Sequence, residues 1–173
     1  KTEYLRRLME KIHDKREGLA NGTIKPKELL VRGSIELLRA LKNAGIQIYL
    51  ASGTDEPQVK EEAALLGVDE FFGEHIYGAL DEHVTSDTKA IVIRRIMDEN
   101  GFDGSELLSF GDGFVEIELV ANIGGYAFAV ATDEARGYGI DSWKRDRLVG
   151  AGASAVIPEF SGYKKIIDFI KGK

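Results

Sequence analysis

Cysteine is absent from the 173-residue chain, and proline and histidine occur only three times each. Without cysteine the chain has no disulfide bond, no thiolate metal site and no cysteine nucleophile, which fits a reducing compartment. His13, His75 and His83 lie far apart in the sequence and form no helical metal motif, so we do not expect a zinc site. With 43% hydrophobic and 30% charged residues, the composition is typical of an ordered globular protein.

Positive charge and long apolar runs are also scarce. The 23 Lys and Arg residues are outnumbered by 29 Asp and Glu residues, which gives a net charge of -6, whereas proteins that bind the nucleic-acid backbone carry basic patches. No window of about 18 residues is continuously apolar. The charged start KTEYLRRLMEK has the features of neither a signal peptide nor a membrane anchor. We therefore expect a cytoplasmic protein that binds neither nucleic acids nor membranes.

The pattern of apolar residues predicts an α/β fold. Helical spacing alternates with short, nearly continuous apolar runs, which are typical of parallel strands covered on both faces. We predict strands over 46–51, 106–110, 126–131 and 153–157, helices over 56–66, 88–100, 115–123, 142–149 and 162–170, and a short extended or loop stretch over 68–80. The expected architecture is a three-layer Rossmann-like core around a parallel sheet, and the chain is long enough for one such domain.

The N-terminal segment is predicted to stand apart from this core. Apolar residues recur at helical spacing in TEYLRRLMEKIHDKR, and Gly18 and Gly22 then end the pattern. We interpret residues 1–22 as a separate helix and hinge, and residues 23–173 as the core domain. A second helix follows Pro26 and ends before Gly45, a typical C-terminal cap. Because the chain begins with Lys1 rather than methionine, we expect further sequence upstream.

Two predicted strands lead into residues that are suited to a reaction site. The first leads into Ser52 and Gly53 in the sequence ASGT, and the second leads into Asp112 in FGDGF. In parallel sheets, binding sites gather beyond the carboxyl ends of the strands, so we expect both segments at one edge. Gly53 allows the backbone to approach a ligand closely, and the helix that follows offers unpaired amides to a phosphate group.

Lys89 and two acidic residues complete the candidate site. Lys89 lies in the first turn of a predicted helix, with Ser86 or Asp87 as its cap. The helix dipole disfavours a cation at this position by ~0.3–1 kcal/mol, so a lysine here is better explained by a nearby anion. Asp112 offers hard oxygens of the kind that Mg2+ binds together with phosphate oxygens and water. Glu116 is expected to support that metal ion.

Each feature also has a purely structural explanation. The turn after Ser52 can be a helix cap, Lys89 can be a solvated lysine, and the glycines around Asp112 can mark an ordinary turn. Glu118 fits the solvent face of a helix, and Trp143 in GYGIDSW fits a packing residue. The order of the three motifs along the chain favours a reaction site over these explanations.

That order resembles the haloacid dehalogenase superfamily, in particular its phosphatase and phosphomutase-like members related to beta-phosphoglucomutase and phosphoglycolate phosphatase. IQIYLASGT is similar to the second motif of the family, Lys89 to its third and FGDGFVEIE to its fourth. The resemblance implies a phosphoryl-transfer site that depends on Mg2+ and acts on a small phosphorylated metabolite such as a sugar phosphate. It implies that Ser52 and Gly53 bind the phosphoryl group together with Lys89. It also implies that Asp112 binds the metal ion and Glu116 supports the metal shell.

The first motif of that family is missing. No Asp-x-Asp sequence occurs in the chain, although the leading aspartate of this motif is the nucleophile in the family. The resemblance therefore implies that the chain alone is inactive and that residues 1–22 are the last helix of a cap domain. It also implies that the first strand of the sheet must come from an upstream segment or from a second molecule.

The sequence is open to two other interpretations. A non-catalytic relative, in which a degenerate phosphatase fold serves binding or assembly, is the main alternative. A signalling receiver domain also combines an aspartate, a hydroxyl residue and a lysine, but its acidic residues come first and its lysine comes last. The order Ser52, Lys89, Asp112 argues against a receiver domain.

Overall fold

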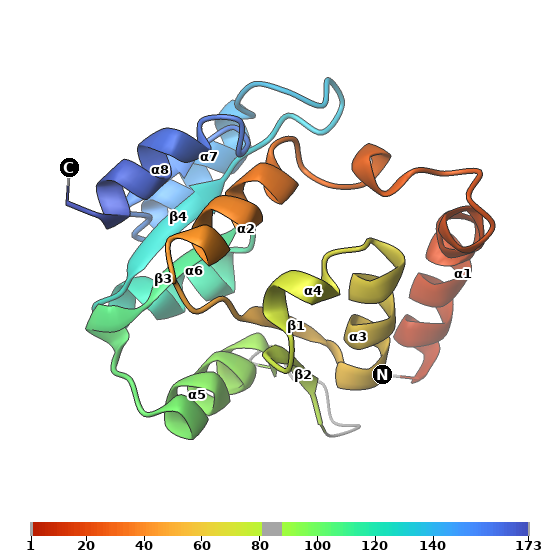
Figure 1. The fold of residues 1–173 in the computed structure, drawn as a ribbon, viewed down its shortest axis with the longest axis horizontal. Coiled ribbons are helices and arrows are strands. Elements are labelled where there is room, and N and C mark those ends of the chain that lie inside the picture. The colour runs from red at the N-terminus through yellow and green to blue at the C-terminus, as the bar shows by residue number, and fades with distance from the viewer. Residues whose placement is uncertain (1, 81–87, 173) are drawn as a thin grey trace.

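The structure, a computed structural model, describes residues 2–80 and 88–172. Helices alternate with strands along the chain (Figure 1). The strands are β1 (Leu50–Asp55), β2 (Ile76–Ala79), β3 (Leu108–Gly111), β4 (Tyr126–Val130) and β5 (Ala155–Ile157). The α-helices are α1 (Thr2–Ala20), α2 (Ser34–Asn43), α3 (Glu56–Leu65), α4 (Asp69–Phe72), α5 (Thr88–Asn100), α6 (Phe114–Asn122), α7 (Ser142–Gly150) and α8 (Tyr163–Ile170). The α/β class predicted from the sequence is confirmed.

The strands form two parallel sheets instead of one. β1 pairs with β2 to form the first half-sheet, and β3, β4 and β5 pair in that order to form the second half-sheet. In the part of the chain that the structure describes, no strand joins β1 to β3, so each of them has one edge without a ladder partner. The two edges still share a core, because Ile48, just before β1, packs in the same apolar cluster as Phe110 of β3.

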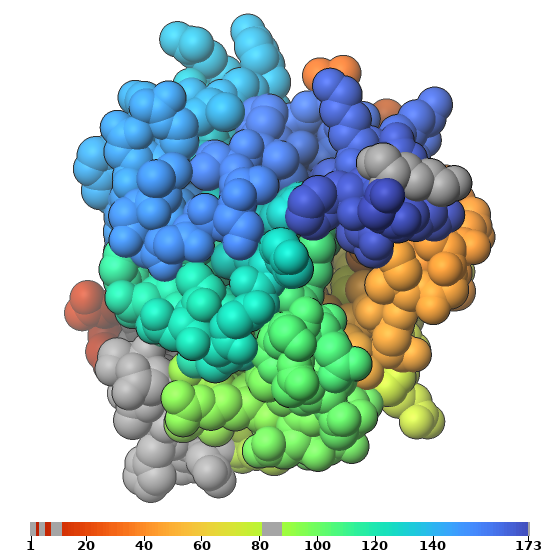
Figure 2. Space-filling model, turned by 90° about the vertical axis from the view of Figure 1, so that its left-hand side faces the viewer, coloured from red at the N-terminus to blue at the C-terminus, as the bar shows by residue number. Residues whose placement is uncertain are grey.

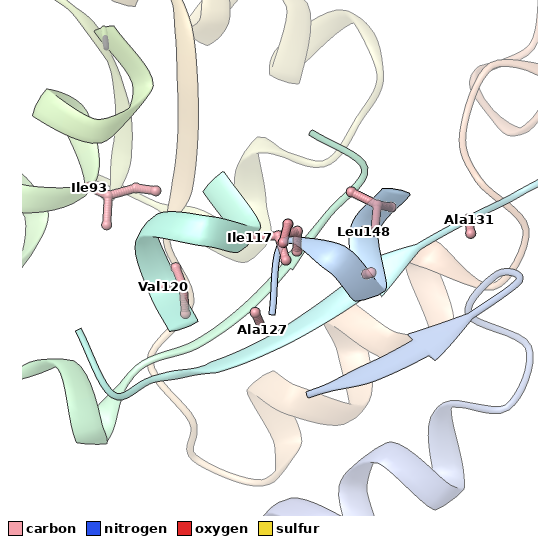
Figure 3. Close-up of a cluster of buried hydrophobic side chains, with 8 residues drawn as sticks. Ile93, Ile117, Val120, Ala127, Ala131 and Leu148 are labelled. Atoms are coloured by element: carbon pink, nitrogen blue, oxygen red, sulfur yellow. The ribbon is translucent and has the colours of Figure 1, made fainter. Parts of the chain in front are cut away.

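Helices cover both faces of the second half-sheet. Side chains alternate between the two faces of a strand, and in β4 this places Ala127 and Ala129 in a buried cluster with Ile117 of α6. Figure 3 shows this cluster, to which α5, α6, β4 and α7 each contribute side chains. Phe128 lies on the other face, in a cluster with residues of α2 and α8. Small alanines thus allow α6 to approach the sheet, and the predicted three-layer core is confirmed.

The first half-sheet is covered in the same way. Residues of α3 and α4 bury Ile76 of β2 on one face, and α5 lies against the other face. Glu56, at the start of α3, forms ion pairs with Lys60 and Arg95 and accepts a hydrogen bond from the Gly78 N–H. Burial raises the pKa of the Glu56 carboxyl, but these hydrogen bonds outweigh it and hold the pKa below its ordinary value. Glu56 therefore ties α3, α5 and β2 together.

β1 differs from the prediction. The sequence predicts a strand over residues 46–51 with Ser52 just beyond its end, but β1 begins at Leu50 and contains Ser52. Its ladder starts where the Leu50 N–H donates to the His75 carbonyl, at 2.9 Å. Residues 46–49 form no strand, since β2 does not extend beside them and no described strand lies at their other edge. The prediction also missed α4 and β2 as distinct elements. It placed the second helix directly after Pro26, but α2 begins only at Ser34, because Gly33 adopts a positive φ of 83° and turns the chain there. The remaining core helices and strands lie within about two residues of their predicted ranges.

α1 lies at one side of the molecule, next to α3 (Figure 1). Arg16 joins the two helices through ion pairs with Glu61 and Glu62. The helix continues to Ala20, past Gly18. None of the helices in the described part of the chain combines the length and apolar character that a membrane crossing needs. The division of the chain at residue 22 stays a prediction.

Candidate active site

Segments that are distant in the sequence meet near the ends of β1 and β3. Gly53 of β1 lies beside the start of α5, because a Cβ built on it would be 4.0 Å from the backbone nitrogen and the Cβ of Lys89. The Lys89 ammonium forms an ion pair with the carboxylate of Glu116 in α6. In turn, Glu116 Oε1 accepts a hydrogen bond from the Gly113 N–H, at 3.2 Å. Figure 2 shows α6 (teal) lying between α5 (green) and the region of α7 and α8 (blue). The structure thus brings Gly53, Lys89 and Glu116 together with the glycine corner that carries Asp112.

Glu116 is a buried carboxylate with its charge compensated. Its side chain is 7% exposed, whereas that of Lys89 is 35% exposed. Burying a charge is costly unless an opposite charge and hydrogen bonds replace water, and Lys89 and the Gly113 N–H do so here. The glycines of the corner make room for this carboxylate. A Cβ on Gly111 would overlap it, and a Cβ on Gly113 would lie 2.9 Å from Glu116 Oε2.

We expect the substitution Gly111→Ala to lower the free energy of unfolding by about 1–3 kcal/mol, because the added methyl must push Glu116 away from Lys89. Urea unfolding followed by circular dichroism measures this change. Gly150→Ala in α7 is the matched control: nothing lies within 4 Å of a Cβ built there, and alanine in a helix is favoured over glycine by about 0.5–1 kcal/mol. Equal effects of the two substitutions would contradict this account of the corner.

Asp112 lies on the exposed side of the corner. Its side chain is 63% exposed, and its Oδ2 is 3.8 Å from Nζ of Lys144 in α7. Lys144 Nζ also donates a hydrogen bond to Glu134 Oε1, at 2.7 Å. This hydrogen bond raises the pKa of Lys144 above its ordinary value; burial opposes the shift, and the attraction of Glu134, Asp112 and Asp141 adds to it. The Lys144 ammonium therefore stays charged beside Asp112.

One residue of this site, Asp112, offers oxygens that suit a magnesium ion. Asp112 has hard, exposed carboxylate oxygens, and Lys144, its ion-pair partner among the described residues, lies beyond hydrogen-bond distance. Both oxygens of Glu116 are occupied, by Lys89 and by the Gly113 N–H. Within residues 2–80 and 88–172, no group of three or more His, Asp or Glu side chains could hold a metal ion. Asp112 therefore fits a direct metal ligand, whereas Glu116 fits a residue that positions Lys89.

Ser52 is placed near this group but is not bonded to it. It is half-buried, and its Oγ accepts a hydrogen bond from the Thr54 N–H, at 3.1 Å. This bond leaves the Ser52 hydroxyl with its own proton to donate. Among the described residues, no hydrogen bond or ion pair joins Ser52 to Lys89 or Asp112. The predicted helix caps at residues 86 and 87 lie outside the described residues.

Sequence reasoning missed Lys144 and Glu134. Both residues follow the carboxyl end of β4, which runs parallel to β3. Because binding sites gather beyond the carboxyl ends of parallel strands, the position of these residues in the sequence was a signal that could have identified them. The prediction that Trp143 is a packing residue is wrong, because Trp143 is 69% exposed. Its ring lies 5.5 Å from the guanidinium of Arg147. α7 instead buries Leu148, which lies on a different face of the helix.

Comparison with protein families identifies a family to which the chain is similar. The sequence model of the haloacid dehalogenase-like hydrolases matches residues 3–124. No curated protein matches the chain.

Several solved structures have a similar fold. They include a HAD family hydrolase from Deinococcus radiodurans with bound phosphate and sodium (TM-score 0.64, 16% identity, 82% of this chain and 60% of that one). A protein named as a predicted phosphatase from Clostridium acetobutylicum gives a TM-score of 0.65 (22% identity, 79% of this chain and 59% of that one). A protein from Thermotoga maritima assigned as a beta-phosphoglucomutase gives 0.61 (17% identity, 82% of this chain and 59% of that one). The chain therefore spans about three fifths of the length of the structures that it matches.

Proposed function

The chain belongs to the haloacid dehalogenase-like hydrolase family, and from this membership we propose that it provides most of the reaction site of a magnesium-dependent phosphohydrolase or phosphomutase. The substrate is a small phosphorylated metabolite, such as a sugar phosphate. The observation that carries the proposal is the ion pair between Lys89 and Glu116. It joins the start of α5 to the corner that bears Asp112, beside Gly53, so that a phosphate-binding group and a metal-binding group lie close together. The cysteine-free composition fits action in the cytoplasm.

In the proposed site the phosphoryl group lies between β1 and α5. The Ser52 hydroxyl and the backbone amides after Gly53 donate hydrogen bonds to its oxygens. Lys89 neutralises part of its negative charge, and Glu116 keeps the Lys89 ammonium in place. These groups position the phosphate and stabilise charge without forming a covalent bond to it.

Mg2+ would be held by Asp112 and by oxygens from outside this chain. When bound, it supplies further neutralisation of the charge on the phosphoryl oxygens. The carboxylate of Asp112 is exposed and can therefore reach the metal ion. It extends from the glycine corner, whose shape depends on the buried side chain of Glu116.

A nucleophilic carboxylate has to come from outside the residues described above. The chain contains no Asp-x-Asp sequence, and β1 and β3 each have a free edge within the described structure. We propose that a strand from another segment or from a second molecule pairs with both edges. If it runs parallel to β1 and β3, its carboxyl end lies at the same edge of the sheet as Ser52 and Asp112. The chain alone is then inactive.

A non-catalytic role in binding or assembly is the second candidate function. It is favoured by the same absence of an Asp-x-Asp sequence and by the pairing of Lys89 with a residue of its own chain. A site of this kind would retain a phosphate-binding surface without turnover.

Release of phosphate from p-nitrophenyl phosphate tests the proposal. The chain is assayed alone and with a synthetic peptide of about six to eight apolar, β-forming residues that ends in Asp-x-Asp. We expect phosphate release only when both the peptide and Mg2+ are present, and its loss on addition of EDTA. Release that persists without magnesium would refute the mechanism. A chain that binds the peptide but releases no phosphate would favour the non-catalytic role.

A further inference from the structure

Lys144 lies between two carboxylates beside the proposed metal ligand. Its ammonium is 2.7 Å from Glu134 Oε1 and 3.8 Å from Asp112 Oδ2. Its side chain is 19% exposed, whereas Glu134 is 77% exposed and Asp112 is 63% exposed. The lysine is therefore the most shielded member of the group, and both carboxylates reach it from the solvent side.

The position of Lys144 is set by the start of α7. The Lys144 N–H donates a hydrogen bond to Asp141 Oδ1, at 2.8 Å, which caps the helix. One turn further along, Leu148 is 1% exposed and anchors α7 in the core cluster. The fold thus fixes the point at which the Lys144 side chain leaves α7, and the ion pair with Glu134 holds its ammonium near Asp112.

A fixed positive charge at this distance opposes a second cation on the same carboxylate. Lys144 partly neutralises Asp112 and repels a divalent ion placed there. Glu134 acts in the opposite direction, because it is the nearer partner and draws the ammonium away from Asp112. The two residues therefore have opposed effects on the charge that Asp112 presents.

We propose that Lys144 and Glu134 together set the affinity of Asp112 for Mg2+: Lys144 is a built-in counter-cation that competes with the metal ion, and Glu134 weakens that competition. This inference rests on the proposed function, because it requires Asp112 to be a metal ligand. In this proposal Lys144 acts on metal binding through the charge that it places beside Asp112, and it does not touch the substrate.

Titration with Mn2+ of the 173-residue chain bound to the Asp-x-Asp peptide of the activity assay, followed by the electron paramagnetic resonance signal of the free ion, tests the inference. We expect Lys144→Met to tighten Mn2+ binding about two- to tenfold and Glu134→Gln to weaken it by a similar factor. Lys144→Arg keeps the charge and should bind Mn2+ like the wild type. Lys165→Met, which removes an exposed lysine of α8, is the control for net charge and should have no effect.

The double variant shows whether Glu134 acts through Lys144. In Lys144→Met/Glu134→Gln the ammonium is absent, so binding should equal that of Lys144→Met alone. A double variant that binds clearly more weakly would mean that Glu134 attracts the metal ion directly, and this would overturn its assigned role.

Asp112→Asn separates failure of the inference from failure of the proposed function. If this substitution abolishes Mn2+ binding while Lys144→Met leaves it unchanged, the inference is wrong and the metal site stands. If Asp112→Asn has no effect, or the wild type with the peptide bound binds no Mn2+, the proposed metal site and the inference both fall.

Discussion

Replacing Asp112 by asparagine is expected to lower magnesium-dependent phosphate release by at least about a hundredfold in the protein supplied with the Asp-x-Asp strand. The amide keeps the shape of the carboxylate but removes the charge that binds a divalent cation, and a metal ion held in this way lowers the reaction barrier by several kcal/mol. The fold should be unaffected, because the Asp112 side chain is 63% exposed and its contact with Lys144 is 3.8 Å long. The rate of phosphate release at a Mg2+ concentration that just saturates the wild type measures the change.

Asp146→Asn is the matched control for this substitution. Asp146 is a carboxylate of α7 that is 68% exposed and pairs with its neighbour Arg145. Its replacement changes the net charge by the same amount, so a general electrostatic effect would appear in both variants. Retention of full activity by Asp112→Asn would remove Asp112 from the mechanism.

Supplying a strand between β1 and β3 is expected to raise the midpoint of thermal unfolding by at least about 5 °C. A stabilisation of 1 kcal/mol shifts the midpoint of a domain of this size by about 2–4 °C. A bound strand satisfies backbone groups on two edges, and each buried group left unpaired costs about 1–3 kcal/mol. Apolar side chains flank the two edges: Ile48 and Phe110 pack in one cluster, and Ala51 packs against the other cluster, which contains Ala127 and Ala129.

The peptide of the activity assay provides this strand, and differential scanning fluorimetry follows the midpoint. The same peptide with a proline at its centre is the control, because proline cannot donate to a ladder in the middle of a sheet. Amide hydrogen exchange should show new protection over residues 46–55 and 108–111 only with the unmodified peptide. A sharp, reversible transition of the isolated chain as a monomer, unchanged by the peptide, would show that the sheet needs no further strand.

The sequence predicted most elements of the second half-sheet because their patterns are local. β4 reads YAFAV, and its strict alternation of small and large residues matches its two different faces. α5 was predicted with its observed bounds, since Thr88 to Asn100 carries a clear helical period. The sequence also predicted that Lys89 has an anionic partner. That partner in the structure is Glu116, which had been expected to support the metal ion.

What the sequence did not predict depends on contacts between distant segments. The start of β1 was predicted four residues too early. Residues 46–49 have the alternating apolar pattern of a strand, but hydrogen bonds to a neighbouring strand exist only from Leu50 on, where β2 lies beside β1. The need for glycine at position 111 could not be predicted from the adjacent residues, since it depends on where the Glu116 side chain lies in the fold. Lys144 carries no motif, and its proximity to Asp112 results from the packing of α7 against the sheet.

The division of the sheet has a consequence for how such a site works. Ser52 and Gly53 belong to the first half-sheet, and Lys89 lies on the helix that covers it. Asp112 directly follows β3 of the second half-sheet, and Glu116 lies on α6, which packs against that half-sheet. The proposed active geometry is therefore not a property of either part but of their alignment, and the ion pair between Lys89 and Glu116 is one direct link across the division. A displacement of about 1 Å between reacting groups is enough to slow a reaction a hundredfold. A strand that fits between the halves would therefore act as a spacer that sets the distance between phosphate and metal, in addition to any carboxylate it brings.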